Sequence, residues 1–377
     1  MSMSSTRKLR IGVLGAGAWA KHAHIPGWQR HPNAEVVALC DPNQPLAVDL
    51  ARTFNIPKVE TDHRAVIERD DIDVIDVVTP SITHFDLSWA ALEAGKHVLC
   101  EKPIAYDFRD TLRARDLAQS KKRKTKVGLT FRYAPAMQYM RDLIARGFIG
   151  TPFIFNGFEQ NSQWLDPHTP LRQIPDPFAD QSQIHVSSLE GYGAPVIDIM
   201  HLCVGANIEQ IVCTMKNFIP ERMVRQTGKM MRQNIDDGDM FMAEFANGAI
   251  GSIQTSFVTV GNYPGIEARV YGSEGALWVR LIEEFGRCEV LRAARPDDVE
   301  FKQIEVPQKY YPPGGSPQEN WRTLFYANLI TSFVEEILSE GDENQGDFTD
   351  GAWVQEVINA AELSFRSRAW QALPLDR

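Results

Sequence analysis

The chain has 377 residues, of which 49 are Asp or Glu and 39 are Lys or Arg, so its formal net charge is −10. Hydrophobic residues make up 44% and charged residues 23% of the chain, as in ordinary globular proteins and unlike disordered chains. The surplus of acidic residues argues against nucleic-acid binding. A membrane span is also excluded, because the sequence contains no stretch of about 18 uncharged apolar residues.

Length and cysteine usage limit the possible organisation. At roughly 100–200 residues per domain, the chain is expected to form two domains, with three as the alternative. The cysteines lack a C-x-x-C spacing, so we expect neither a disulfide framework nor a zinc cluster. Asp166 and His168 are not expected to bind a metal ion, because no third ligand lies at a characteristic spacing from them. Residues 1–10 lack the apolar core of a secretory signal, which favours a cytoplasmic protein. The cysteines are Cys40, Cys100, Cys203, Cys213 and Cys288.

The first third of the chain alternates apolar runs with helix-like segments. Continuous apolar strands separated by helices are typical of a parallel sheet that is covered on both faces. The pattern predicts an α/β fold, with a doubly wound Rossmann domain over residues 1–127. The predicted strands are 9–14, 36–40, 74–78, 97–100 and 126–129.

After about residue 150 the pattern changes to β-favouring runs. Asn247-Gly248 lies between two of them and is a strong hairpin signal. Residues 128–377 are expected to form an α+β domain with a large, mostly antiparallel open sheet. This domain is expected to bind the substrate, and its sheet to form the subunit interface of a homodimer or homotetramer. The C-terminal helices could pack back on the first domain. The predicted elements are a loop over 160–183, strands at 208–216, 238–245, 249–258, 267–271 and 275–279, and helices at 195–204, 319–340 and 350–370.

A glycine-rich turn follows the first predicted strand. Gly15-Ala16-Gly17-Ala18-Trp19-Ala20 has the form G-x-G-x-x-A, which lets the backbone approach a pyrophosphate at a helix N-terminus. Gly15, Gly17, Ala18 and Trp19 are therefore expected to bind a dinucleotide. Asp41 ends the second strand, where a carboxylate accepts hydrogen bonds from ribose hydroxyls and repels a 2′-phosphate. The motif thus predicts NAD as cofactor, with NADP disfavoured.

Two further motifs follow the third and fourth strands. They are Thr79-Pro80-Ser81-Ile82-Thr83-His84 and Glu101-Lys102-Pro103. With the glycine-rich turn, they make the chain resemble the Gfo/Idh/MocA oxidoreductases, the glucose–fructose oxidoreductase and inositol dehydrogenase family. Looser matches extend the resemblance over the whole chain, at Val127-Gly128, Arg132-Tyr133, Pro135, Phe218 to Arg222, Phe245 to Ala249 and Tyr271 to Ala276.

The resemblance implies hydride transfer between nicotinamide and a carbinol or carbonyl carbon of a sugar, sugar derivative or polyol. It implies that Lys102 is the catalytic lysine and contacts the substrate. A lysine beside a cationic ring in a partly desolvated pocket can exchange a proton with the reacting oxygen. The implied cofactor residues are Thr79, Pro80, His84, Glu101, Lys102 and Arg132, and Tyr133 is an implied substrate residue.

The chain departs from the family where many members carry D-x-G-x-H before a substrate-facing helix. Aligning the helix ends places Gly191 and Pro195 at the positions of that Asp and His, and Asp198 at a second acid of the family. On this register the usual acid–base pair is missing. A rival register uses Asp198 and His201, which share a helix face because they are three residues apart.

Other polar residues could replace the missing pair. His185, Glu190 and Tyr192 lie just upstream of the predicted helix. We expect Tyr192, with Asp198 and His201, to serve in catalysis, and His185 and Asp198 to contact substrate. Trp164, in the predicted long loop, is expected to cover the face of a sugar, although such a loop could equally contact another domain or subunit.

Two other functions fit the same motifs. One is an NAD-dependent glycosidase, which retains the cofactor and uses transient oxidation to permit elimination. The other is a non-catalytic regulator that senses the nucleotide on the same fold. The Glu101-Lys102-Pro103 motif argues against the regulator, because a sensor has no need of a catalytic lysine. Accumulation of NADH distinguishes a dehydrogenase from the glycosidase.

Overall fold

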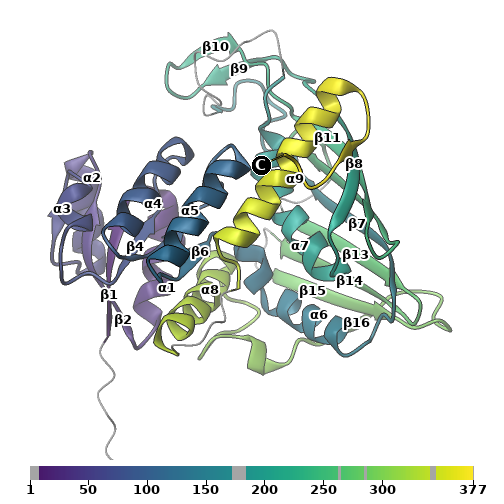
Figure 1. Ribbon diagram of the computed structural model, residues 1–377, viewed down its shortest axis with the longest axis horizontal. Coiled ribbons are helices and arrows are strands. Elements are labelled where there is room, and N and C mark those ends of the chain that lie inside the picture. The colour runs from purple at the N-terminus through teal and green to yellow at the C-terminus, as the bar shows by residue number, and fades with distance from the viewer. Residues whose placement is uncertain (1–7, 172–183, 262–264, 284–286, 340–344, 377) are drawn as a thin grey trace, which may run out of the picture. The chain divides into compact units, whose positions relative to one another are not determined.

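The computed structural model describes residues 8–171, 184–261, 265–283, 287–339 and 345–376. The chain divides into two compact units, shown in Figure 1. The first comprises Met1–Tyr133, Tyr311–Gly315 and Asn320–Gln355, and the second comprises the rest. A late segment of the sequence, which contains a long helix, therefore belongs to the first unit.

The first unit is built on a six-stranded parallel sheet. Its order, β3-β2-β1-β4-β5-β6, is that of a Rossmann domain, with strand order reversing between β1 and β4. All strands point the same way, so the segments that follow β1, β2, β4 and β5 meet at one edge. The strands are β1 (Leu9–Leu14), β2 (Ala34–Cys40), β3 (Val59–Glu60), β4 (Val74–Val77), β5 (His97–Cys100) and β6 (Thr125–Val127).

Helices cover this sheet. In Figure 1, α4 and α5 lie side by side, and α1 packs against α8. The helical elements of this unit are η1 (Ala20–His24), α1 (Ile25–Arg30), α2 (Gln44–Phe54), α3 (Arg64–Ile67), η2 (Ser81–Thr83), α4 (His84–Glu93), α5 (Phe108–Ser120), η3 (Thr130–Tyr133) and α8 (Trp321–Leu338).

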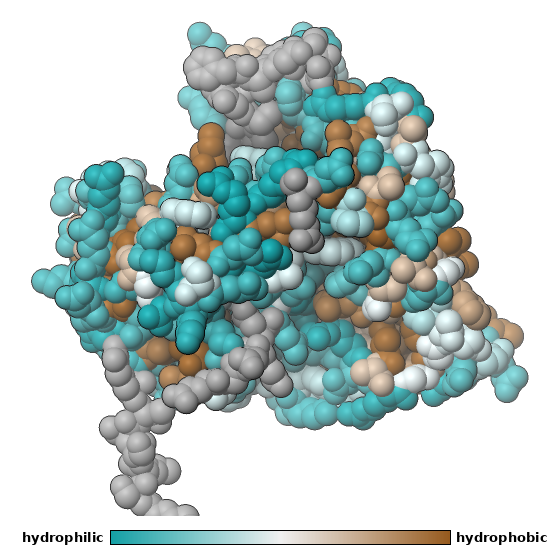
Figure 2. Space-filling view, viewed as in Figure 1, coloured by the Kyte–Doolittle hydropathy of each residue, from teal (hydrophilic) through white to brown (hydrophobic). Residues whose placement is uncertain are grey.

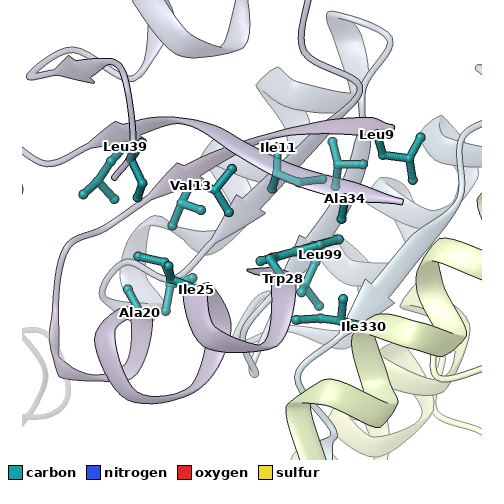
Figure 3. Close-up of a cluster of buried hydrophobic side chains, with 14 of the residues drawn as sticks. Leu9, Ile11, Val13, Ala20, Ile25, Trp28, Ala34, Leu39, Leu99 and Ile330 are labelled. Atoms are coloured by element: carbon teal, nitrogen blue, oxygen red, sulfur yellow. The ribbon is translucent and has the colours of Figure 1, made fainter. Parts of the chain in front are cut away.

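The core of the first unit joins distant parts of the sequence. Figure 3 shows Trp28 of α1 beside Leu99 of β5 and Ile330 of α8, all fully buried. Gly27 permits this contact, because a Cβ there would lie 2.6 Å from the Ile330 side chain. Burying a Trp or Ile side chain contributes on the order of 2 kcal/mol. The helix α8 is therefore part of the first hydrophobic core.

The second unit contains a nine-stranded sheet. Its order is β16-β15-β14-β13-β7-β12-β11-β8-β17, and its pairs are antiparallel except for β7 and β12, which are parallel. The strands are β7 (Pro152–Gln160), β8 (Ile208–Lys216), β11 (Gly238–Phe245), β12 (Ile250–Ser256), β13 (Ile266–Gly272), β14 (Ala276–Glu283), β15 (Arg287–Ala294), β16 (Lys302–Ile304) and β17 (Gln371–Ala372).

One face of this sheet is covered by helices. α6 contacts β14 and β15, and α7 contacts β7 and β13 (Figure 1). The remaining elements of the unit include a separate hairpin and a helix that begins in the first unit and ends in this one. They are β9 (Glu221–Val224), β10 (Lys229–Arg232), α6 (Pro135–Ala145), η4 (Leu189–Gly193), α7 (Ala194–Val204), η5 (Gln308–Tyr310) and α9 (Phe348–Ser367).

The predicted α/β fold class, with its parallel and mostly antiparallel sheets, is confirmed. The Asn247-Gly248 hairpin joins β11 to β12, with Gly248 at a φ of 83°. The predicted fifth strand, 126–129, is wrong at its C-terminal end. The strand β6 stops at Val127, and Gly128 passes close to Glu101. The strands from β15 onward and the β9–β10 hairpin were not predicted, because they are short or lack clear alternation.

The predicted loop over 160–183 is described only to Leu171, and its remainder lies outside the described residues. Within the described part of the chain, no helix has the length and hydropathy of a membrane span. Figure 2 shows mostly hydrophilic residues on the face in view, with hydrophobic residues in separate small groups.

Candidate active site and cofactor-binding site

The turn after β1 has the geometry of a dinucleotide cradle. Gly15 has a φ of 107°, and a Cβ there would lie 2.5 Å from the Val78 carbonyl oxygen. Only glycine fits such a conformation and such a close approach. Gly17 is exposed, and a Cβ there would meet nothing within 4 Å. The space beside Gly17 suits a pyrophosphate that approaches the backbone at the start of η1.

Asp41, directly after β2, is joined to this turn. Its Oδ2 accepts a hydrogen bond of 2.8 Å from the backbone N–H of Ala16. Its Oδ1 accepts one of 2.8 Å from the N–H of Asn43. These bonds fix the carboxylate at the carboxyl edge of the sheet, where a Rossmann domain binds the ribose of NAD. The residues present thus fit the predicted cofactor.

The segments after β4 and β5 are joined by His84. Its Nδ1 lies 2.7 Å from the Pro103 carbonyl oxygen and its Nε2 lies 2.9 Å from that of Thr79. His84 is buried, at 2% exposure. The ring therefore connects the two motifs that carry the family resemblance, and it holds the backbone at Pro103, next to Lys102, and at Thr79, next to Pro80.

Lys102 and Glu101 lie at the carboxyl end of β5. Lys102 is half-buried and precedes a cis peptide bond to Pro103. The Glu101 side chain is 14% exposed and accepts hydrogen bonds from the Tyr326 hydroxyl and from Trp19 Nε1, the latter at 3.3 Å. Gly128 leaves room for this carboxylate, since a Cβ there would lie 2.4 Å from Glu101 Oε1.

A buried histidine completes the surroundings of Glu101. His24 Nε2 lies 3.1 Å from Glu101 Oε1, and His24 Nδ1 lies 2.9 Å from both oxygens of Asp76. Burial by itself lowers the pKa of His24, but the two carboxylates outweigh it and raise that pKa to about 9. His24 is therefore an imidazolium ion at neutral pH.

His24, Asp76 and Tyr326 were not among the predicted site residues. A signal for Asp76 exists in the sequence, because it is the one acid within the apolar run Val74-Ile75-Asp76-Val77-Val78. A charged residue in a strand that is buried on both faces needs a partner. The sequence did not identify that partner, and Tyr326 comes from a helix more than 200 residues later.

Arg132 and Tyr133, which the resemblance assigns to the cofactor and the substrate, are both buried. Arg132 is 2% exposed and its Nη1 forms an ion pair of 2.8 Å with Asp350. Tyr133 is 6% exposed and donates a hydrogen bond of 3.0 Å to the Gln345 carbonyl oxygen. These contacts tie η3 to the first turn of α9 and to the segment before it. Direct contact of either side chain with cofactor or substrate stays a prediction.

In the second unit, Trp164 and Tyr192 belong to one aromatic cluster. Their ring centroids are 6.4 Å apart, and those of Trp164 and Phe257 are 5.5 Å apart. Tyr192 donates a hydrogen bond of 2.8 Å to the Gln163 side chain, and burial raises its pKa. Both Trp164 and Tyr192 are half-buried. The structure thus brings these two predicted site residues together.

Tyr192 lies in the π-helical turn η4, which leads into α7. A π-turn holds one more residue than an α-helical turn and is frequent at functional sites. A buried acid caps this turn: Asp236 accepts hydrogen bonds from the N–H groups of Ser187, Ser188 (3.0 Å) and Leu189 (2.9 Å). This cap fixes the start of η4, the turn that contains Tyr192.

A second buried acid lies beside Asp236. Asp239 accepts a hydrogen bond from the Thr255 hydroxyl, and Thr255 also bonds to Ser188 at 2.9 Å. Burial raises the pKa of both carboxyls, and the charge of Asp236 raises that of Asp239 further. Asp236 receives three backbone N–H bonds, so we assign the negative charge to Asp236 and the proton to Asp239.

The remaining predicted residues surround this turn. Asp198 and His201 lie on α7, with Asp198 buried at 2% exposure and His201 half-buried. His185 forms a short bridge with Ile235, immediately before Asp236. Their roles in catalysis and substrate binding stay predictions. Among the described residues, no group of three His, Cys, Asp or Glu side chains could hold a metal ion.

Comparisons with known proteins agree with this geometry. Residues 9–129 match the model of an oxidoreductase family with an NAD-binding Rossmann fold, and residues 137–278 match the GFO/IDH/MocA C-terminal domain. A levoglucosan dehydrogenase from Pseudarthrobacter phenanthrenivorans is 28% identical over 98% of this chain and 99% of its own length. The scyllo-inositol 2-dehydrogenase (NAD+) of Bacillus subtilis is 27% identical over 72% of this chain and 74% of its own length.

Solved structures share the whole fold. A levoglucosan dehydrogenase in complex with NADH matches with a TM-score of 0.83 and 26% identity, over 98% of this chain and 100% of that one. An NAD-binding oxidoreductase from Klebsiella pneumoniae matches with a TM-score of 0.86 and 26% identity, over the same shares. The matches to both domain models confirm the predicted family and cofactor. The chain belongs to the Gfo/Idh/MocA oxidoreductases, and its first unit is an NAD-binding Rossmann domain.

Proposed function

We propose that this oxidoreductase uses NAD to oxidise a secondary alcohol of a cyclic sugar derivative, with Lys102 as the catalytic base. The observation that carries the proposal is the position of Lys102 at the carboxyl edge of the sheet that also bears the glycine-rich turn and Asp41. Full-length similarity to a levoglucosan dehydrogenase makes an anhydrosugar the first compound to test.

The reaction removes a hydride from the carbinol carbon and a proton from its hydroxyl group. NAD, when bound, accepts the hydride. Lys102 in its neutral form accepts the hydroxyl proton, so that the alcohol becomes a ketone and the lysine an ammonium ion. His84 keeps the Lys102–Pro103 backbone fixed against the Thr79 segment, which orients the amine.

The substrate contacts are proposed for the second unit. Trp164 and Tyr192 offer aromatic faces that can cover the C–H face of a sugar ring, and the neighbouring Gln163 offers an amide for its hydroxyl groups. A rigid anhydrosugar loses little conformational entropy on binding such a surface. Asp198, His201 and His185 are proposed to hold the remaining hydroxyl groups.

Absorbance of NADH tests the proposal. The purified protein is mixed with NAD and with anhydrosugars, aldoses, inositols or glycosides, alongside Lys102→Met and the exposed-lysine control Lys216→Met. NADH formation with a sugar compound, lost in Lys102→Met and kept in Lys216→Met, is the expected result. Release of an aglycone without NADH would indicate the glycosidase, and NAD binding without turnover would indicate the regulator; either outcome contradicts a dehydrogenase.

We further propose that the protein is a homodimer or homotetramer that buries the open face of the nine-stranded sheet. Four apolar side chains that are at least 40% exposed share one face of this sheet and lie on adjoining strands: Ile154, Met240, Met242 and Ile250. Light scattering at micromolar concentration is expected to give a multiple of the 42.5 kDa chain mass. Met242→Lys should shift the mass towards the monomer, whereas Val299→Lys, at a fully exposed residue outside the sheet, should not.

The reaction is proposed to take place in the cytoplasm, where NAD is supplied by metabolism. Four cysteines, Cys40, Cys100, Cys203 and Cys213, are buried free thiols, which suits a reducing compartment. Cell fractionation followed by immunodetection tests this location, and recovery outside the cytoplasmic fraction would contradict it.

A further inference from the structure

Two carboxylates and one histidine form a buried charged cluster that includes Glu101, the residue before Lys102. Asp76 and His24 are 0% exposed, and the Glu101 side chain is 14% exposed. His24 lies between the two acids, 2.9 Å from Asp76 and 3.1 Å from Glu101. Since β4 pairs with β5, Asp76 and Glu101 approach His24 from adjacent strands. One cation therefore serves two buried anions.

Aromatic side chains also donate hydrogen bonds to both acids. Trp28 Nε1 donates to Asp76 at 2.7 Å. The Tyr326 hydroxyl donates to Glu101 and itself accepts from Trp19 Nε1 at 2.6 Å. Burial and the Glu101 charge raise the pKa of Tyr326 well above its usual range, so it stays a donor. The Glu101 carboxylate thus has a fixed orientation.

Charge compensation extends from this cluster to Lys102. Burial by itself raises the pKa of Glu101, but His24, Tyr326 and the Lys102 ammonium together lower it. The Glu101 carboxylate therefore interacts with two cations, His24 and Lys102. The titratable groups around His24 and Glu101 in the described structure include Asp76, Lys102, Tyr326 and the Cys100 thiol, whose pKa is raised by burial and further by the charges of Glu101 and Asp76.

We propose that His24, fixed by Asp76, is a positioning residue that orients Glu101 and neutralises part of its charge, and thereby sets how readily Lys102 gives up its proton. This inference rests on the proposed role of Lys102 as catalytic base. If His24 loses its charge, the full negative charge of Glu101 acts on Lys102. The ammonium form then gains stability and the base is less available at neutral pH.

The experiment compares wild-type protein with His24→Gln, which keeps a hydrogen-bonding side chain and removes the charge. His22→Gln is the matched control, since His22 lies in the same η1 turn and is exposed. The rate of Lys102 acylation by acetic anhydride is measured against pH, with peptide mass spectrometry as the readout. This rate reports the neutral amine directly and needs no sugar substrate.

In His24→Gln, the midpoint of the Lys102 labelling curve is expected to move upward by about one pH unit. The kcat at neutral pH should then fall about tenfold and recover at higher pH, because one pH unit changes the neutral amine fraction tenfold. The KM for NAD should stay within about twofold. His22→Gln should match the wild type in all three measurements.

An unchanged labelling midpoint in His24→Gln would overturn the proposal, even if kcat or thermal stability falls. A merely structural role of His24 would lower kcat and thermal stability without moving the midpoint. If His24→Gln fails to fold, Asp76→Asn takes its place: it frees His24 from its anchor, and a midpoint equal to the wild type again contradicts the proposal. Absence of NADH formation by the wild type would refute the proposed function, while the labelling curve still tests His24.

Discussion

The Asp41 carboxylate accepts a hydrogen bond from the backbone N–H of Ala16, at 2.8 Å, and so joins the end of β2 to the glycine-rich turn after β1. Its second oxygen accepts from the N–H of Asn43. The acid that is predicted to select the nucleotide therefore also supports the turn that is predicted to receive the pyrophosphate. If both predictions hold, nucleotide preference and the shape of the turn depend on the same side chain.

Replacement of Asp41 is expected to weaken the preference for NAD. In Asp41→Ser, the negative charge that repels a 2′-phosphate is absent, so the ratio of NADPH to NADH affinity should rise about tenfold or more, equivalent to about 1.4 kcal/mol. Fluorescence titration with each reduced nucleotide measures the ratio. Asp49→Ser, at an exposed residue of α2, should leave it unchanged. An unaltered ratio in Asp41→Ser would show that another group selects the nucleotide.

The two glycines of the turn should respond differently to alanine. In Gly17→Ala, the new methyl group meets open space in the protein, so the free energy of unfolding should change by less than about 0.5 kcal/mol. NADH affinity should nevertheless fall about tenfold, because the methyl group occupies the space proposed for the pyrophosphate.

Gly15→Ala places a Cβ 2.5 Å from a backbone oxygen at a φ of 107° and should destabilise the fold by about 2 kcal/mol or more. Thermal denaturation and NADH titration separate the two effects. Equal NADH affinity of Gly17→Ala and the wild type would argue against the proposed cradle.

Stability should depend on pH through His24. Its pKa is raised from 6.5 to about 9, so the folded state retains a proton that the unfolded state releases between these values. The resulting stabilisation is complete below pH 6.5 and is lost as the pH rises through 9, with a total of about 3 kcal/mol. Urea denaturation across this range should show a decline that is absent in His24→Gln and present in His22→Gln. A parallel decline in wild type and His24→Gln would mean that His24 is not charged in the folded protein.

Replacing the two buried acids near η4, Asp236 and Asp239, by asparagine should change the stability of the fold by different amounts. Asp239→Asn replaces a protonated carboxyl by a neutral group of the same shape, so thermal stability at pH 7 should be maintained or increased. Asp236→Asn weakens the cap on three backbone N–H groups and should destabilise the fold by about 2 kcal/mol. Differential scanning calorimetry of both variants tests this order, and the reverse order would move the proton to Asp236.

Trp164 should contribute to substrate binding. Trp164→Ala removes the aromatic face proposed to cover the sugar and should raise the KM for the sugar about tenfold, with the KM for NAD nearly unchanged. Trp164→Phe should retain most of the affinity because it keeps a ring. Trp370→Ala, at a residue that is 43% exposed, serves as control. A KM that is unchanged in Trp164→Ala would exclude this residue from the substrate site.

The sequence by itself determined the Rossmann domain, the cofactor turn and the family. These depend on local patterns: apolar strands of fixed length, glycines at fixed spacing, and short motifs directly after strands. Gly15, Asp41 and Lys102 were placed correctly at one sheet edge because parallel strands end together, a rule that needs no knowledge of distant contacts. The second sheet was predicted from alternation and turn residues in the same way.

Only the tertiary structure decided which side chains meet across long sequence separations. Asp76 was visible as an acid in an apolar strand, but its pairing with His24 depends on how η1 packs on the sheet, and Tyr326 reaches Glu101 from α8. The neighbouring acids Asp236 and Asp239 carry no motif, yet Asp236 caps η4, and Asp239 is linked through Thr255 to Ser188, the residue before η4. Such contacts follow from packing of several elements at once, which the pattern of any single segment does not encode.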